Sequence, residues 1–207
     1  MTEFQSASIS VPSGENSEDR AAIFRLDGPL LTVVADGAGG VSGAERAADG
    51  VVYLIGEAIE DGFTGESGPA WADLLAKVDR EIYEDPYAGE TAAVIAYITD
   101  SGVMGAGVGD CVAWMVGPRI DDLTSRMSRK PLLGTGFAVP VPFEIPELHG
   151  TLLLASDGLV KYVKRDVIQA ELAGPHLDAV CERLVDRARM KSGHLQDDIS
   201  VILVRKS

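Results

Sequence analysis

Acidic residues recur in this sequence where apolar segments begin or end. Asp36 ends one apolar run and Asp157 ends another. Three further sites share the pattern: Glu18 and Asp19 before an apolar run, Asp110 between two runs, and Asp197 and Asp198 before the last run. A single acid in such a place is most often a turn former. Five such sites predict that several carboxylates meet, provided that the strand ends converge.

Converging carboxylates have a specific chemical use. Like charges a few ångströms apart raise one another's pKa unless a cation lies between them. Oxygen ligands without histidine or cysteine select hard ions such as magnesium, manganese or calcium. A pair of such ions sharing one carboxylate is able to hold a hydroxide and clamp a phosphoryl group. The pattern therefore points to a divalent-ion site suited to phosphoryl chemistry.

The elements that must position these acids follow from hydrophobic periodicity. The apolar runs Ala21–Leu26 and Leu30–Ala35 flank Asp27-Gly28-Pro29 and predict a β-hairpin. Helical spacing of apolar residues predicts helices over Ala44–Ile59, Trp71–Ile82, Asp166–Leu172 and Leu177–Met190. Further strands are expected at Thr91–Thr99, Val103–Val108, Cys111–Val116, Thr151–Ala155 and Ile199–Arg205, with a short alternating piece at Ser8–Pro12. The proline-bearing stretch 117–150 is expected to be irregular.

The order of these elements is strands, two helices, strands, two helices and a strand. Antiparallel hairpins and paired helices favour an α+β fold over a repeating βαβ unit. No composition shift or linker divides the chain, so residues 1–207 are expected to form a single domain.

Composition excludes several classes of function. The 18 Lys and Arg against 32 Asp and Glu give a net charge of −14, which argues against binding to nucleic acid or to an anionic membrane. The first 20 residues lack the features of a secretory leader, and no apolar stretch is long enough to span a membrane. Cys111 and Cys181 lie in apolar stretches and are expected to be buried, reduced thiols of a cytoplasmic protein.

Two other kinds of site fit poorly. The glycines from Gly37 to Gly40 suggest a dinucleotide-binding loop, but the third glycine of that pattern is replaced by Ser42, and Asp36 would repel a pyrophosphate. A nucleophile elbow of the form Gly-x-Ser-x-Gly does not occur in the sequence.

Six short motifs, in the same order, resemble those of the metal-dependent serine/threonine protein phosphatases of type 2C, the PPM family, and in particular its compact bacterial members. They are Ser17-Glu18-Asp19, Val34–Gly40 (Val-Ala-Asp-Gly-Ala-Gly-Gly), Gly89–Ala92, Val108-Gly109-Asp110, Leu154–Leu159 (Leu-Ala-Ser-Asp-Gly-Leu) and Asp197–Val201 (Asp-Asp-Ile-Ser-Val). The resemblance covers roughly residues 8–205 and implies a four-layer αββα sandwich, in which two antiparallel sheets are flanked by helix pairs.

The resemblance also implies a site. Asp36 would bridge two Mg²⁺ or Mn²⁺ ions, the Gly37 carbonyl would bind one of them, and Asp157 and Asp197 would complete the other. Asp110, with Asp157, matches the third-ion position of bacterial members. Glu18 and Asp19 would hold ion-bound waters, and Asp198 stands beside them. A water bridging the ions would hydrolyse phosphoserine or phosphothreonine on a protein substrate, with Asp36, Asp157 and Asp19 as the catalytic set.

The sequence departs from the family in five places, one of which is Cys111-Val112 after Asp110, where the family has Ser-Arg. The arginine that grips the substrate phosphate is replaced by Gly14, so that Arg20 or Lys130 would have to substitute. A histidine present in some members is Ala38 here. Asp198 replaces an asparagine, and its added charge would either tighten ion binding or be solvated. The stretch 117–150 is short for the family's mobile flap, which predicts an exposed cleft and loose selectivity among phosphopeptides.

Two alternatives to an active protein phosphatase stay open on this evidence. The missing arginine favours a catalytically weak, phosphatase-like binding or regulatory module, whereas the retained Asp36, Asp157 and Asp197 disfavour it. A phosphatase for a non-protein phosphate ester is the other alternative. The sequence does not identify the substrate or the oligomeric state.

Overall fold

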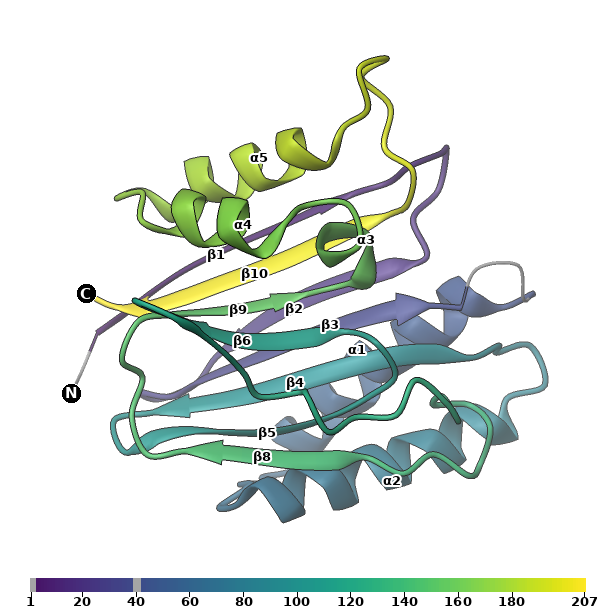
Figure 1. Cartoon of the computed structure of the whole chain (residues 1–207). Coiled ribbons are helices and arrows are strands. Elements are labelled where there is room, and N and C mark those ends of the chain that lie inside the picture. Colours follow the sequence, from purple (N-terminus) through teal and green to yellow (C-terminus); the bar gives the residue numbers. More distant parts are fainter. Residues whose placement is uncertain (1–2, 39–41) are drawn as a thin grey trace.

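Two antiparallel, five-stranded sheets face each other in the computed structural model of the chain, which describes residues 3–38 and 42–207 (Figure 1). The first sheet has the order β1-β10-β9-β6-β7, with β1 at Phe4–Val11, β10 at Ile199–Lys206, β9 at Thr151–Ala155, β6 at Val112–Val116 and β7 at Ile120–Asp122. The second has the order β2-β3-β4-β5-β8, with β2 at Asp19–Arg25, β3 at Leu30–Gly37, β4 at Thr91–Thr99, β5 at Gly102–Val108 and β8 at Val141–Ile145.

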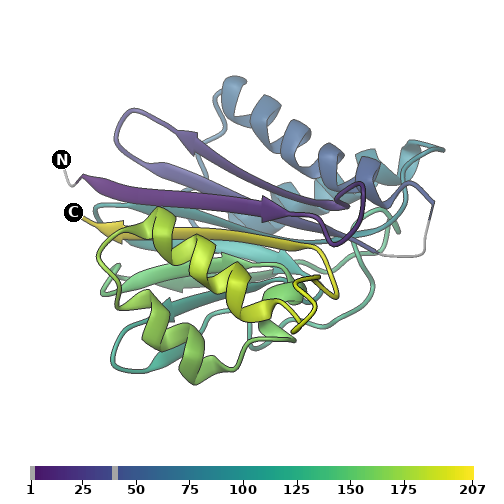
Figure 2. The same cartoon turned by 90° about the horizontal axis from the view of Figure 1, so that it is seen from above.

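Helix pairs cover the outer faces of both sheets. Helices α1 (Ala44–Glu60) and α2 (Gly68–Glu84) pack on the second sheet. Helices α4 (Arg165–Leu172) and α5 (Leu177–Ala188) pack on the first, and Figure 2 looks down onto them. The short helix α3 (Asp157–Val160) follows β9 directly. The predicted α+β class and the αββα sandwich are confirmed.

Three hydrophobic layers hold this arrangement together, one between the sheets and one under each helix pair. Strand β3 is central and contacts apolar groups on both faces, which explains why Leu30–Ala35 is a continuous apolar run rather than an alternating one. Strand β1 lies at the edge of its sheet, where only Phe4 and Ala7 are buried and the other residues are partly or fully exposed. It begins at Phe4, earlier than the alternating piece predicted at Ser8–Pro12.

The stretch 117–150 is more regular than expected, because it contains β7 and β8. Strand β7 forms a short hairpin with β6, and β8 pairs with β5 at the edge of the second sheet. Pro142 lies within β8, where an edge strand tolerates the missing amide donor. Pro142 therefore belongs to an edge strand, whereas Pro131, Pro140 and Pro146 lie outside the strands.

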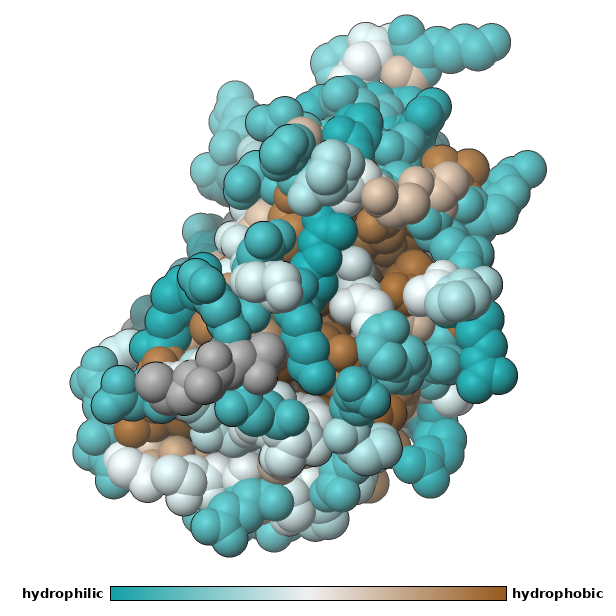
Figure 3. Space-filling model, turned by 90° about the vertical axis from the view of Figure 1, so that its left-hand side faces the viewer, coloured by the Kyte–Doolittle hydropathy of each residue, from teal (hydrophilic) through white to brown (hydrophobic). Residues whose placement is uncertain are grey.

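The remaining expectations about elements are confirmed to within a few residues, and both cysteines are buried free thiols. Glu171 on α4 binds two arginines of α5, Arg183 at 2.7 Å and Arg187 at 2.8 Å, and thereby ties the two helices together. Within residues 3–38 and 42–207, no helix combines the length and apolar character needed to cross a membrane. Hydrophilic residues cover much of the end of the molecule where the termini lie, with hydrophobic atoms showing between them (Figure 3).

Candidate active site

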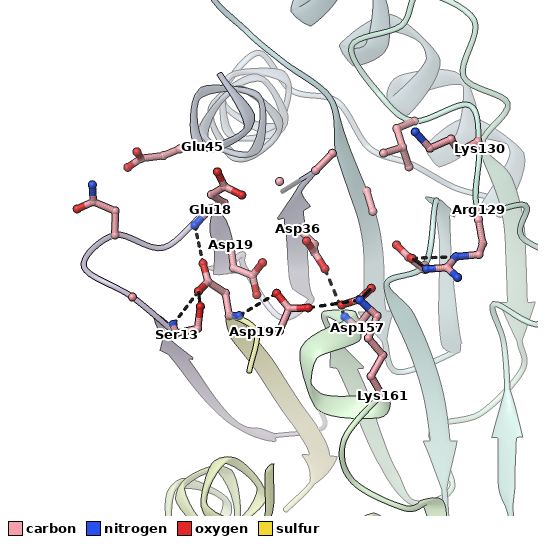
Figure 4. Close-up of a pocket in the computed structure, with 18 residues that line it drawn as sticks. Ser13, Glu18, Asp19, Asp36, Glu45, Arg129, Lys130, Asp157, Lys161 and Asp197 are labelled. Carbon is pink, nitrogen blue, oxygen red and sulfur yellow. Dashed lines mark hydrogen bonds and ion pairs between the residues drawn. The ribbon is translucent and has the colours of Figure 1, made fainter. Parts of the chain in front are cut away.

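A pocket of about 660 Å³ gathers residues from both sheets (Figure 4). All the acids that the sequence singled out line it: Glu18, Asp19, Asp36, Asp110, Asp157, Asp197 and Asp198. Gly14, Gly37, Ala38 and Lys130 line it as well. Gly39 and Gly40 of the glycine-rich motif lie outside the described residues. The strand ends therefore converge as expected, and they bring the predicted site residues into one place.

Strand register places the innermost carboxylates. Asp19 and Asp36 are directly opposite each other in the antiparallel β2–β3 pair. The hydroxyl of Thr91 on β4 donates to the Asp36 carbonyl at 2.9 Å. From the other sheet, the backbone N–H of Asp157 lies 3.4 Å from the Asp36 carboxylate. Asp36 is therefore in contact with residues of both sheets at the end of the sandwich where the acids gather.

Helix α3 approaches the segment before β10 so closely that only glycine fits at its second residue. A Cβ at Gly158 would lie 1.9 Å from the carbonyl oxygen of Asp198. Asp157 and Asp197 therefore emerge side by side from neighbouring strands of the first sheet. The Ser-Asp-Gly sequence is thus a packing requirement as well as a source of a carboxylate.

Burial and mutual repulsion disturb the titration of the inner carboxylates. Burial, followed by the charges of Asp19 and Asp157, raises the pKa of Asp36 to about 9. Burial also raises the pKa of Asp19 to about 7, although a hydrogen bond from Ser156 opposes the shift. The Oδ2 atom of Asp19 is buried without a hydrogen-bond partner among the described residues. Full ionisation of both carboxyls is therefore unfavourable unless a cation lies beside them.

Lys161 is a functional residue that the sequence reasoning missed. Its ammonium lies 2.5 Å from the Asp157 carboxylate and 3.3 Å from the Asp197 carboxylate, and so contacts both of these acids (Figure 4). Burial alone would lower the pKa of Lys161, but its contacts with these two acids outweigh burial and raise it. The signal was available, because Lys161 follows Asp157 by one helical turn.

Asp110 is reached through a tight turn between β5 and β6. Gly109 adopts a φ of +89°, a conformation that favours glycine. The Asp110 carboxylate binds the guanidinium of Arg129 at 2.5 Å. Arg129, also missed in the sequence, therefore neutralises the acid on this side of the pocket.

Asp198 has a structural role that neither expectation anticipated. It accepts hydrogen bonds from the N–H and hydroxyl of Ser13, at 2.7 and 2.8 Å, and from the N–H of Glu18 at 2.7 Å. Burial opposes ionisation of this carboxyl, but these donors lower its pKa. Asp198 therefore anchors the segment that carries Glu18 over the pocket.

The two candidates for a phosphate-binding cation, Arg20 and Lys130, differ in whether they reach the pocket. The Arg20 guanidinium binds Asp49 at 2.5 Å and Glu45 at 2.8 Å, both on α1, and Arg20 does not line the pocket. Lys130 does line the pocket, and its nearest acid, Glu90, is 3.8 Å away. Lys130 is therefore the better placed of the two.

The donor set fits hard divalent ions. It is made of oxygen ligands, it includes the orphaned carboxylate oxygen of Asp19, and it lies in a pocket open to solvent. Within the described ranges, no group of three or more acidic, histidine or cysteine side chains is already arranged to hold a metal ion. The ion pairs of Lys161 with Asp157 and Asp197, and of Arg129 with Asp110, occupy carboxylates that an ion would need.

Comparison with known proteins agrees with this chemistry. A family model described as protein phosphatase 2C matches residues 10–130. No curated protein sequence matches the chain. Among solved structures, a variant of a bacterial serine phosphatase is similar at 25% identity and a TM-score of 0.84, covering 100% of this chain and 99% of that one. The serine/threonine phosphatase Stp1 from Staphylococcus aureus matches at 23% identity and a TM-score of 0.84, covering 99% and 95%.

A third similar structure is the catalytic domain of the serine/threonine protein phosphatase PstP in complex with two manganese ions. It matches at 18% identity and a TM-score of 0.78, covering 98% of each chain. The matched family model spans more than half of the 207 residues. The chain therefore belongs to the protein phosphatase 2C family and is a metal-dependent protein serine/threonine phosphatase.

Proposed function

We propose that the pocket holds two divalent ions, Mg²⁺ or Mn²⁺, and hydrolyses phosphoserine or phosphothreonine on proteins. Asp36 and the Gly37 carbonyl, with Asp157 and Asp197, would hold the ions. Glu18 and Asp19 would orient water around them, with Asp198 holding the Glu18 segment in place. The observation that carries the proposal is the buried, mutually repelling pair Asp19 and Asp36, which Asp157 approaches from the opposite sheet.

Bound ions would supply Lewis acidity, which lowers the pKa of water and neutralises phosphoryl oxygens. The chain's own contribution is positioning. The buried carboxylates fix the geometry, and Lys130 provides the cation toward the substrate phosphate in place of the arginine that Gly14 replaces. Because Ala38 provides no acid, the proton for the departing serine or threonine oxygen would come from solvent in the open pocket.

A third ion at Asp110 and Asp157 would have to displace two cations. Arg129 holds Asp110 and Lys161 holds Asp157. We therefore expect a third ion to bind more weakly than the first two.

The whole chain, 1–207, is proposed to act as one phosphatase domain with a shortened flap. The stretch 117–150 uses part of its length for β7 and β8, and it contributes Arg129, Lys130 and Leu132 to the pocket lining. Phosphorylated proteins are the proposed substrates, and a cytoplasmic location remains the expectation from the cysteine content.

Hydrolysis of a phosphothreonine peptide with Mn²⁺ or Mg²⁺ tests the proposal, with chelator and the Asp157→Asn variant as controls. We expect metal-dependent phosphate release that is lost in both controls. Absence of turnover by protein whose circular dichroism is native would contradict the proposal and favour the regulatory-module alternative. Faster turnover of small phosphate esters than of phosphopeptides would favour a non-protein substrate.

A further inference from the structure

Six exposed cations lie on two chain segments that each contribute residues to the catalytic pocket, and we call these six the basic border. Arg126, Arg129 and Lys130 lie between β7 and β8. Lys161 and Lys164 lie between α3 and α4, and Arg165 is the first residue of α4. The surrounding segments 123–132 and 158–165 contain no acidic residue. A third of the chain's 18 Lys and Arg residues thus gather here, although the net charge is −14.

The basic border is continuous with the catalytic pocket. Arg129, Lys130 and Lys161 line that pocket. Lys161, Lys164 and Arg165 also line a neighbouring groove of about 580 Å³. Because Lys161 belongs to both, a peptide whose phosphorylated residue enters the pocket would place adjacent residues along the groove. An extended peptide advances about 3.3 Å per residue, so the residues concerned are the next few in the peptide.

The groove is structured and not a featureless patch of surface. Its floor includes Val112, Val163 and Trp114. The Arg165 guanidinium stacks over the Trp114 ring at 4.4 Å and binds Asp122 at 2.7 Å, which fixes its direction. The Trp114 Nε1–H beneath it is buried and has no acceptor within the described parts of the chain. These features give the groove an ordered cationic wall over an apolar floor.

Part of this charge is available to a partner, although Arg129, Lys161 and Arg165 each bind an acid. Arg126 and Lys164 form no ion pair with any described residue, and Lys130 has only the 3.8 Å contact with Glu90. Elsewhere the acidic surface would repel an acidic ligand, so this border is the region where such a ligand is attracted.

We propose that the basic border docks acidic residues that flank the phosphorylated serine or threonine of the substrate protein. This inference rests on the proposed function, since the phosphorylated residue must occupy the catalytic pocket. An exposed cleft is expected to distinguish phosphopeptides poorly by shape. The basic border would add discrimination among phosphopeptides by charge. Docking contacts of this kind act mainly on KM, because they lie outside the reacting centre.

The test compares two phosphothreonine peptides of equal length, one with neutral flanking residues and one with acidic residues on both sides. Parallel peptides with acids on one side only identify the direction of binding. The test variant is a double variant that combines Lys164→Glu with Arg126→Glu, and both positions lie outside the ion site. The control for a charge reversal away from the border is Lys77→Glu, at an exposed lysine of α2 without an ion-pair partner among the described residues.

We expect the native enzyme to show a KM about 5- to 10-fold lower for the acidic peptide, with similar kcat, and a smaller ratio at high salt. The double variant should lose most of this preference, whereas Lys77→Glu should keep it. Equal KM values for the two peptides, or a preference that survives the double variant, would overturn the inference. Equal KM values together with retention on anionic vesicles would instead assign the border to a membrane surface. If the neutral peptide is hydrolysed, the proposed function holds whatever the KM comparison shows. If neither peptide is hydrolysed, the proposed function itself has failed.

Discussion

Replacing Lys161 should strengthen divalent-ion binding, because its ammonium occupies two carboxylates that an ion needs. The ion pairs measure 2.5 Å to Asp157 and 3.3 Å to Asp197, and the lysine side chain is 43% exposed. Ion pairs at such partly exposed positions are each worth about 0.5–1 kcal/mol. Together they oppose ion binding by roughly 1–2 kcal/mol, which corresponds to about a 5- to 30-fold change in dissociation constant. Lys161→Gln should lower the Mn²⁺ dissociation constant by that factor.

Isothermal titration with Mn²⁺ at pH 7.5 measures this effect directly, without any contribution from turnover. Lys164→Gln is the matched control, because it removes the same charge three residues away without touching a carboxylate in the described structure. The control should bind Mn²⁺ like the native protein. A dissociation constant for Lys161→Gln that is unchanged or higher, while the control behaves as expected, would refute the view that the lysine competes with the ion.

Three further predictions concern stability and substrate binding. Hydrogen bonds from its two arginine partners lower the pKa of Glu171, so its stabilising effect is present above the unfolded-state pKa and is lost as pH falls through the folded-state pKa. Glu171→Gln should therefore lower the urea midpoint more at pH 7 than at pH 3, and equal losses at both pH values would contradict this. Gly158→Ala should destabilise the protein by at least about 2 kcal/mol in thermal unfolding, because its Cβ would lie 1.9 Å from a backbone carbonyl. Gly14→Ala, with no atom within 4 Å of its Cβ, should have little effect, and similar melting temperatures would disprove the packing argument. Lys130→Ala should raise KM for a phosphopeptide about 5-fold or more, whereas Arg20→Ala, bound to α1, should not, and the reverse order would exchange their roles.

Most of the fold could be predicted because local pattern and tertiary environment agree. Thr91–Thr99 has strand bounds identical to those expected, since a central strand buried on both faces reads as a continuous apolar run. The errors fall at sheet edges. Strand β8 contains a proline, and only its place beside β5 makes that proline acceptable. An edge position depends on pairing between distant segments, which periodicity does not report.

The acids of the site could be predicted because each stands next to a glycine or at a strand end. Lys161 could have been predicted as well, because it follows Asp157 by one helical turn. Arg129 could not, since only the fold brings it to Asp110. Asp198 shows the same limit, because its hydrogen bonds to Ser13 cross more than 180 positions of sequence. The sequence also offered Arg20 and Lys130 as equals, and only the position of α1 distinguishes them.

Titration of the protein with Mn²⁺, native and Asp36→Asn, tests the central claim most directly, because Asp36 is the carboxylate proposed to bridge both ions. Asp73→Asn, an exposed acid of α2, is the control for charge alone. We predict two ions per native chain and per Asp73→Asn chain, and loss of tight binding in Asp36→Asn, whose thermal unfolding should no longer shift with Mn²⁺. Unchanged stoichiometry and affinity in Asp36→Asn would contradict the account, because the ions would then be held elsewhere.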